Sequence, residues 1–155
     1  MVKPTESPHL FDGSVDATQQ QIFYQDPSSN TTTTIYRSVN QDKGIEFTWS
    51  VWINITNLAY LGNKYRTVFF KGNDAVGPDG LNSPNNAPGV YLVPNTNALL
   101  IMMNTYEVIN HEIIIPDIPI NIWLFSHNQL LPSKPNSSPP EQYSGPEEFC
   151  GVDAL

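Results

Sequence analysis

The chain has 155 residues and a hydrophobic fraction of 39%, which fits one globular domain. Charged residues make up only 14% while Asn, Thr, Ser, Pro and Gly are plentiful, so the composition favours strands joined by turns and argues against a helical bundle. The formal net charge of −8 comes from scattered carboxylates without a basic stripe, which argues against a nucleic-acid partner.

Residues 1–33 are polar and interrupted by prolines, so we expect a mobile lead-in with one short strand at 21–24. The N-terminus lacks the apolar core of a secretory signal, and no window reaches the ~20 apolar residues that span a bilayer. The sequence therefore predicts no membrane span in this chain and leaves its localisation open.

The clearest strand pattern lies at residues 46–55, where polar and apolar side chains alternate. Such alternation is typical of a strand with one face on a core and the other toward solvent or a groove. Trp52 is the exception, because it falls on the polar face. The apolar face holds Phe47, Trp49, Val51, Ile53 and Ile55, and the polar face holds Glu46, Thr48, Ser50 and Asn54.

Further short apolar runs follow, each bounded by Gly, Pro or Asn, and their spacing predicts an antiparallel β-sandwich or jelly roll over residues 34–125. The turn-forming residues 94–97 predict a hairpin between two of the runs, 90–93 and 99–103. The complete set of runs is 65–71, 90–93, 99–103, 113–115 and 118–125.

Two segments lack this pattern. Residues 72–89 form a long loop dense in Gly, Asn, Asp and Pro, and loops of that length are usually functional or disordered. Residues 126–155 form a Pro- and Ser-rich tail, which we expect to be disordered and not to pack.

Three segments in this order, 47–53 (FTWSVWI), 68–73 (VFFKGN) and 89–92 (GVYL), resemble successive strands of laminin G-like domains in the concanavalin A-like lectin/glucanase superfamily. The sequences of residues 44–50 (GIEFTWS) and 86–92 (NAPGVYL) are similar to those of laminin G-like proteins encoded by large DNA viruses. The resemblance covers residues 35–123. It implies a jelly roll that acts as a non-catalytic binding or structural module, recognises glycan or protein, and belongs to a virion.

The chain departs from that family after Trp123. Family members continue with further strands that close the second sheet, whereas here Leu124 and Phe125 lead into the proline-rich tail. Our hypothesis is a truncated or frame-shifted gene, which would leave the sandwich incomplete and expose apolar sheet faces and strand edges.

Two sets of candidate site residues follow. Trp52, with Tyr91 and Tyr106, could stack on a sugar ring. The alternative is that Trp52 covers the core, which we favour because large aromatic side chains are mostly buried. The resemblance also implies calcium at a rim loop, for which Asn73, Asp74, Asp79 and Asn82 supply oxygen atoms; the alternative is that these residues only form turns.

No catalytic apparatus is visible. A retaining glycosidase needs two carboxyl groups about 5 Å apart, whereas Glu46, Glu107 and Glu112 stand alone in the sequence. The three histidines are far apart, so zinc is unsupported, and the single Cys150 excludes a thiolate cluster. We therefore predict a non-enzymatic module, with a glucanase-like hydrolase or a non-functional fragment as the alternatives.

Overall fold

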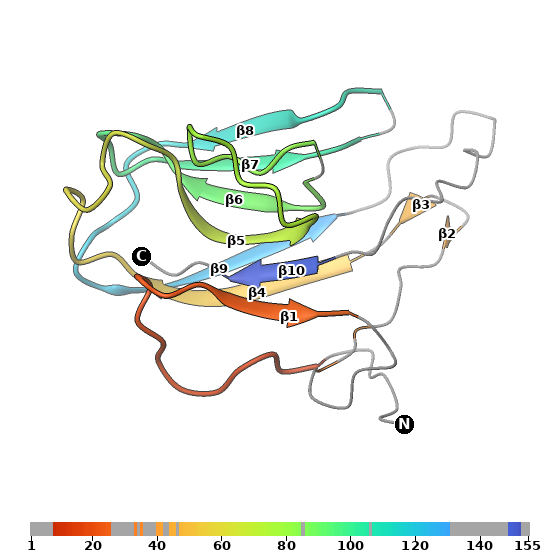
Figure 1. The fold of residues 1–155 in the computed structure, drawn as a ribbon, viewed down its shortest axis with the longest axis horizontal. Helices are drawn as coiled ribbons and strands as arrows, with labels where there is room; N and C mark the ends of the chain where they lie inside the picture. The colour runs from red at the N-terminus through yellow and green to blue at the C-terminus, as the bar shows by residue number, and fades with distance from the viewer. Residues whose placement is uncertain are drawn as a thin grey trace.

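The computed structural model describes residues 8–25, 33, 35, 40–41, 44–45, 47–84, 86–105, 107–130 and 149–152. Every regular element in these ranges is a β-strand, and every strand pairing is antiparallel (Figure 1). The predicted all-β, antiparallel fold class is therefore confirmed. Most of the N-terminal segment predicted to be mobile is described, and the short strand predicted at 21–24 is confirmed as Gln21–Tyr24. Most of the predicted tail, 126–155, lies outside the described residues.

Ten strands make up the described fold, and they fall into one large and two small sheets. The large sheet has the order β1-β10-β5-β6-β7-β8, while β4 pairs with β9 and β2 pairs with β3. The bounds are β1 Gln21–Tyr24, β2 Asn40–Gln41, β3 Gly44–Ile45, β4 Phe47–Asn54, β5 Arg66–Gly72, β6 Gly89–Leu92, β7 Leu99–Met103, β8 His111–Ile115, β9 Trp123–Leu130 and β10 Phe149–Val152.

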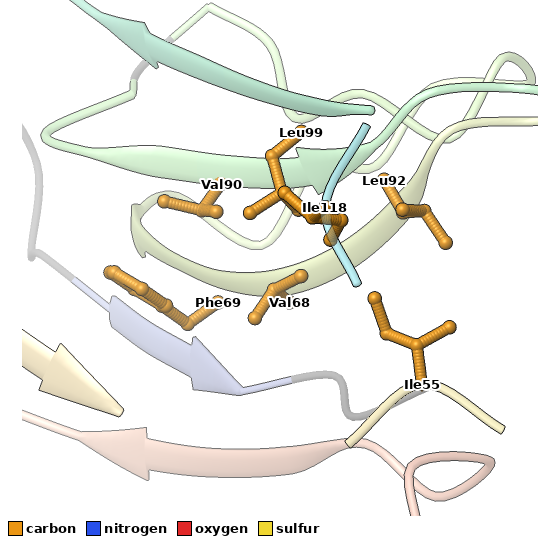
Figure 2. Close-up of a cluster of buried hydrophobic side chains, with 7 residues drawn as sticks. All are labelled: Ile55, Val68, Phe69, Val90, Leu92, Leu99 and Ile118. Carbon is orange, nitrogen blue, oxygen red and sulfur yellow. The ribbon is translucent and has the colours of Figure 1, made fainter. Parts of the chain in front are cut away.

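The main core lies between the six-stranded sheet and the β4–β9 pair. Its fully buried members come from β5, β6 and β7 and from the segments that follow β4 and β8, as Figure 2 shows. Apolar side chains of β4 and β9 pack against it from the opposite layer. The two layers therefore form a β-sandwich whose second layer is much narrower than its first. The buried members are Ile55, Val68, Phe69, Val90, Leu92, Leu99 and Ile118.

The predicted alternation along 46–55 is confirmed from Phe47 to Ile53, whereas Asn54 is half-buried. Trp49, Val51 and Ile53 are half-buried against the core, whereas Thr48 and Ser50 are exposed. The Trp49 ring lies 6.2 Å from the Phe69 ring, centroid to centroid. The period-two pattern thus reports which face of β4 docks on the large sheet.

The central strands of the large sheet are buried on both faces. All of β6 is buried, and so is most of β5. On the face away from β4, Tyr91, Leu100 and Met102 form a second cluster, against which Tyr65 and Leu81 pack. Since Leu81 lies in the 72–89 loop, that loop covers the second face of the sheet.

The predicted hairpin is confirmed, since β6 pairs with β7 in the register Val90 opposite Ile101 and Leu92 opposite Leu99. Within the connection, Asn95 has a φ of 58°, in the left-handed region that asparagine tolerates. The Val93 N–H closes the turn on the Ala98 carbonyl at 2.9 Å.

The structure differs from the sequence prediction at the end of the sandwich. The strand predicted at 118–125 begins only at Trp123, and the preceding residues form a connection that bonds through the Ile118 N–H to the Asn97 carbonyl. That strand then continues to Leu130, because its backbone pairs along the whole of β4. The segment assigned to a non-packing tail thus contributes the end of β9, and also β10, which pairs with β1 and β5.

Candidate functional site

Three large aromatic side chains are exposed on the β4–β9 pair. Trp52 is 62% exposed, Trp123 57% and Phe125 55%. The register places Trp52 directly opposite Phe125 and Asn54 opposite Trp123. The rings of Trp52 and Phe125 are tilted by 44°, with centroids 5.1 Å apart. We call these three residues the outer aromatic cluster.

The alternation of the two strands explains why these rings face away from the core. Residues directly opposite each other in an antiparallel pair share a face, and so do residues two apart along a strand. Trp52 therefore shares its face with exposed Thr48 and Ser50, while Val51 and Leu124 point to the core. Diagonal neighbours such as Trp52 and Trp123 lie ~7–8 Å apart at Cα, within reach of large rings.

The outer aromatic cluster has a defined chemical character. Its described β4 neighbours on that face are the neutral residues Thr48, Ser50 and Asn54, and none of these side chains carries a charge. Exposed aromatic rings beside hydroxyl and amide groups suit a ligand with apolar faces and polar edges. The register also sets His127 opposite Ser50 on this face. The arrangement can bind such a ligand.

Of the three aromatic residues predicted to stack on a sugar ring, the structure exposes Trp52 and buries Tyr91. Trp52 is exposed, so the favoured interpretation that it covers the core is wrong: the ring lies on the face of β4 that points away from the large sheet. Tyr91 is fully buried in the second cluster, so its ring is not available for stacking on a ligand. Tyr106 lies outside the described residues.

Sequence reasoning missed Trp123 and Phe125 as site residues. They stand two positions apart in the sequence, which is the spacing of one strand face. That signal was present, but it becomes informative only when β9 is known to pair with β4 in a register that sets Phe125 beside Trp52.

Tyr91 instead organises a buried polar network beneath the 72–89 loop. Its hydroxyl donates to Asn86 Oδ1 at 2.5 Å and accepts from the Asn82 N–H at 3.2 Å. The Asn86 amide donates in turn to the Asn82 carbonyl at 3.0 Å. Gly80, with a φ of +93°, lets the loop approach so closely that a Cβ there would stand 2.0 Å from the Tyr65 carbonyl oxygen. These contacts hold the 72–89 loop against the large sheet.

The predicted calcium ligands are only partly brought together. The Asn82 amide donates to the Asn73 carbonyl, and Asn73 Nδ2 donates to the Ser83 carbonyl at 3.3 Å. The side-chain Oδ1 atoms of both asparagines are buried and have no hydrogen-bond partner within the described part of the chain. Asp74 is exposed, whereas an Asp79 oxygen accepts from the Leu81 N–H in its own turn at 3.1 Å.

Calcium takes six to eight oxygen ligands, commonly including carboxylates. The amide nitrogens of Asn73 and Asn82 hold backbone carbonyls of the same loop, and an Asp79 carboxylate oxygen accepts within its own turn. Among the described residues, no group of three or more His, Cys, Asp or Glu side chains could hold a metal ion. A calcium site at this loop stays a prediction.

The charged side chains give no paired carboxylates in the described part of the chain. Glu107 lies in a loop and Glu112 on β8, both exposed, and Glu46 lies outside the described residues. The backbone N–H and the hydroxyl of Thr18 lower the pKa of Asp16 below its ordinary value. Asp16 lines a pocket of about 210 Å³ with Thr18, Thr56, Asn57 and Tyr60, which is smaller than the ~300–1,000 Å³ of usual ligand pockets.

Arg66 is the buried cation of the described fold, at 4% exposure. Its Nη1 donates to the carbonyls of Asn57, Leu58 and Tyr60 at 3.4, 3.1 and 3.2 Å. Burial lowers the pKa of its guanidinium group from the ordinary value. These bonds tie the segment after β4 to the start of β5, so Arg66 has a structural role.

Comparison of the chain with protein-family models, with curated proteins and with solved structures finds no match. No helix long and apolar enough to cross a bilayer occurs in the ranges that the structure describes.

Proposed function

We propose that the chain is a non-catalytic, lectin-like binding module that recognises a glycan on the outer face of β4 and β9. The observation that supports this proposal is the outer aromatic cluster: three exposed rings on one face of the β4–β9 pair, of which Trp52 and Phe125 lie 5.1 Å apart. The resemblance to laminin G-like domains points to the same class of function, although a resemblance transfers fold more safely than function.

The described side chains of this face suit a neutral sugar. Pyranose rings have an apolar face that stacks on aromatic rings, and their hydroxyl groups need hydrogen-bond partners at the rim. Trp52 and Phe125 provide the rings, and Thr48 and Ser50 provide neutral hydroxyl groups on the same face. The calcium, viral and virion expectations are not needed for this proposal.

A glycan array followed by titration of the best-binding oligosaccharide tests the proposal. Replacing Trp52→Ala or Trp123→Ala should weaken binding about tenfold or more, since buried aromatic contacts dominate recognition sites. Tyr60→Ala is the matched control, because Tyr60 is an exposed aromatic residue in the loop after β4, outside the ladder, and should leave the affinity within about twofold. Binding that survives both tryptophan replacements would contradict the proposal, as would an array without a bound glycan.

One observation favours a second candidate, a non-functional fragment. The isoleucines of β8 are exposed beside the narrow second layer, as expected if covering strands are missing. A glucanase-like hydrolase is not favoured by any described carboxylate pair. Turnover of a laminarin-like β-glucan that is lost in Glu46→Gln would nevertheless overturn the non-catalytic proposal.

A further inference from the structure

Strand β8 forms one end of the six-stranded sheet, at the top of the view in Figure 1. It pairs with β7 on one side, and no described strand pairs with its other side. A strand in this position presents a row of unpaired backbone N–H and C=O groups, which is a template for another strand. Natural edge strands are usually protected by charge, proline or a bulge.

Glu112 is the one carboxylate within β8, and Pro116 comes only after its last residue. All five residues of β8 are exposed, and Ile113, Ile114 and Ile115 are 51%, 60% and 42% exposed. Ile113 lies opposite Ile101 and shares the face of the main core, whereas Ile114 lies opposite Leu100 on the other face. A strand added here would therefore meet isoleucine on both of its faces. Pro116 ends the ladder, since it has no N–H to donate.

The charge around this edge has one sign. The sequence contains no Lys or Arg between Lys71 and Lys134. Exposed Glu107 precedes β8, exposed Glu112 lies within it, and exposed Asp117 follows it. Among the described residues, none of these three carboxylates takes part in a salt bridge, since the one described bridge joins His9 and Asp12.

We propose that β8 is a docking edge for an extended segment of a partner protein, about five β-branched apolar residues long and flanked by Lys or Arg. The backbone of that segment would add a strand to the large sheet, its apolar side chains would cover the three isoleucines, and its cations would meet the carboxylates. A second copy of this chain fits less well, because each copy carries a net charge of −8 and the two copies would repel each other.

Labelled synthetic peptides test the proposal by fluorescence anisotropy on the full chain. The cationic probe is KKVTVIVKK, and its matched controls are the acidic EEVTVIVEE and a KKVTVIVKK peptide N-methylated at all five residues of the VTVIV segment, so that no N–H of that segment can donate to β8 in either register. The cationic probe should bind with saturation, and the acidic probe about tenfold or more weakly because its charges repel. The N-methylated probe should lose about as much affinity, because its backbone cannot donate hydrogen bonds to β8.

Protein variants locate the site. Glu112→Lys should weaken binding of the cationic probe about fivefold or more while the circular dichroism spectrum stays unchanged. Asp74 is a loop carboxylate outside β8, so Asp74→Lys should change the affinity by less than about twofold. Equal binding of the acidic or N-methylated probe would overturn the proposal, and so would a dimer in sedimentation equilibrium that Glu112→Lys alters. Trp52→Ala should leave peptide binding unchanged, so failure of the glycan proposal is separable from failure of this one.

Discussion

Tyr91 shows at the scale of one residue how burial changes the meaning of an aromatic side chain. The GVYL run of β6 carries no alternation, because both faces of that strand are buried, so the sequence could not tell a ligand-facing tyrosine from a buried one. The structure places the ring in the second cluster and uses the hydroxyl to hold Asn86 and Asn82. Its role is to fix the 72–89 loop.

Tyr91→Phe should therefore destabilise the fold without changing its shape. The replacement keeps the ring but leaves Asn86 Oδ1 and the Asn82 N–H without the hydroxyl, and an unsatisfied buried polar group costs ~1–3 kcal/mol. We expect the free energy of unfolding to fall by about 2 kcal/mol in urea titration, with an unchanged m-value. Tyr60→Phe, at an exposed tyrosine, is the control and should stay within about 0.5 kcal/mol. Equal stabilities of the two variants would show that the network contributes nothing.

At the scale of the element, β4 is the part of the fold that the sequence predicted best. Its period-two pattern is strong because one face meets the core and the other meets solvent. The hairpin of β6 and β7 was also predictable, since its turn residues are local. The partner of β4 was not, because pairing with β9 depends on backbone groups of polar residues near position 128, which a search for apolar runs passes over.

The two faces of β4 should respond oppositely to a carboxylate. Val51→Asp would place a charge between the layers, where Val51 packs on the core, and should cost about 3 kcal/mol or more. Ser50→Asp faces solvent and should change the free energy of unfolding by less than about 0.5 kcal/mol. If Val51→Asp gives no folded protein, Val51→Ala should still fold and lose about 1 kcal/mol. Equal losses of unfolding free energy at positions 50 and 51 would mean that the alternation does not indicate which face of β4 packs on the large sheet.

At the scale of the whole molecule, the unequal layers are the central feature. A six-stranded sheet faces a two-stranded one, so the β8 end of the large sheet extends past its cover in the described fold. The sequence predicted an incomplete sandwich through the absence of further alternating runs after Phe125. It could not predict that β1 and β10, from the two ends of the chain, would extend the same sheet, because pairing between distant segments leaves no local signal.

The exposed apolar face of β8 should be measurable with a dye that fluoresces on apolar surfaces. Ile113 and Ile115 lie on the core side beyond the second layer, so Ile113→Thr with Ile115→Thr should remove most of the dye signal. Since both side chains are about half exposed, the stability cost should stay near 1 kcal/mol. Ile120→Thr with Ile122→Thr is the matched control, because those residues are comparably exposed in the connection before β9, and their loss should leave the signal largely intact. If the dye signal persists in both double variants and the thermal transition is broad and non-cooperative, the protein is a loosely packed fragment. If the folded wild-type protein gives no dye signal, the β8 face is covered.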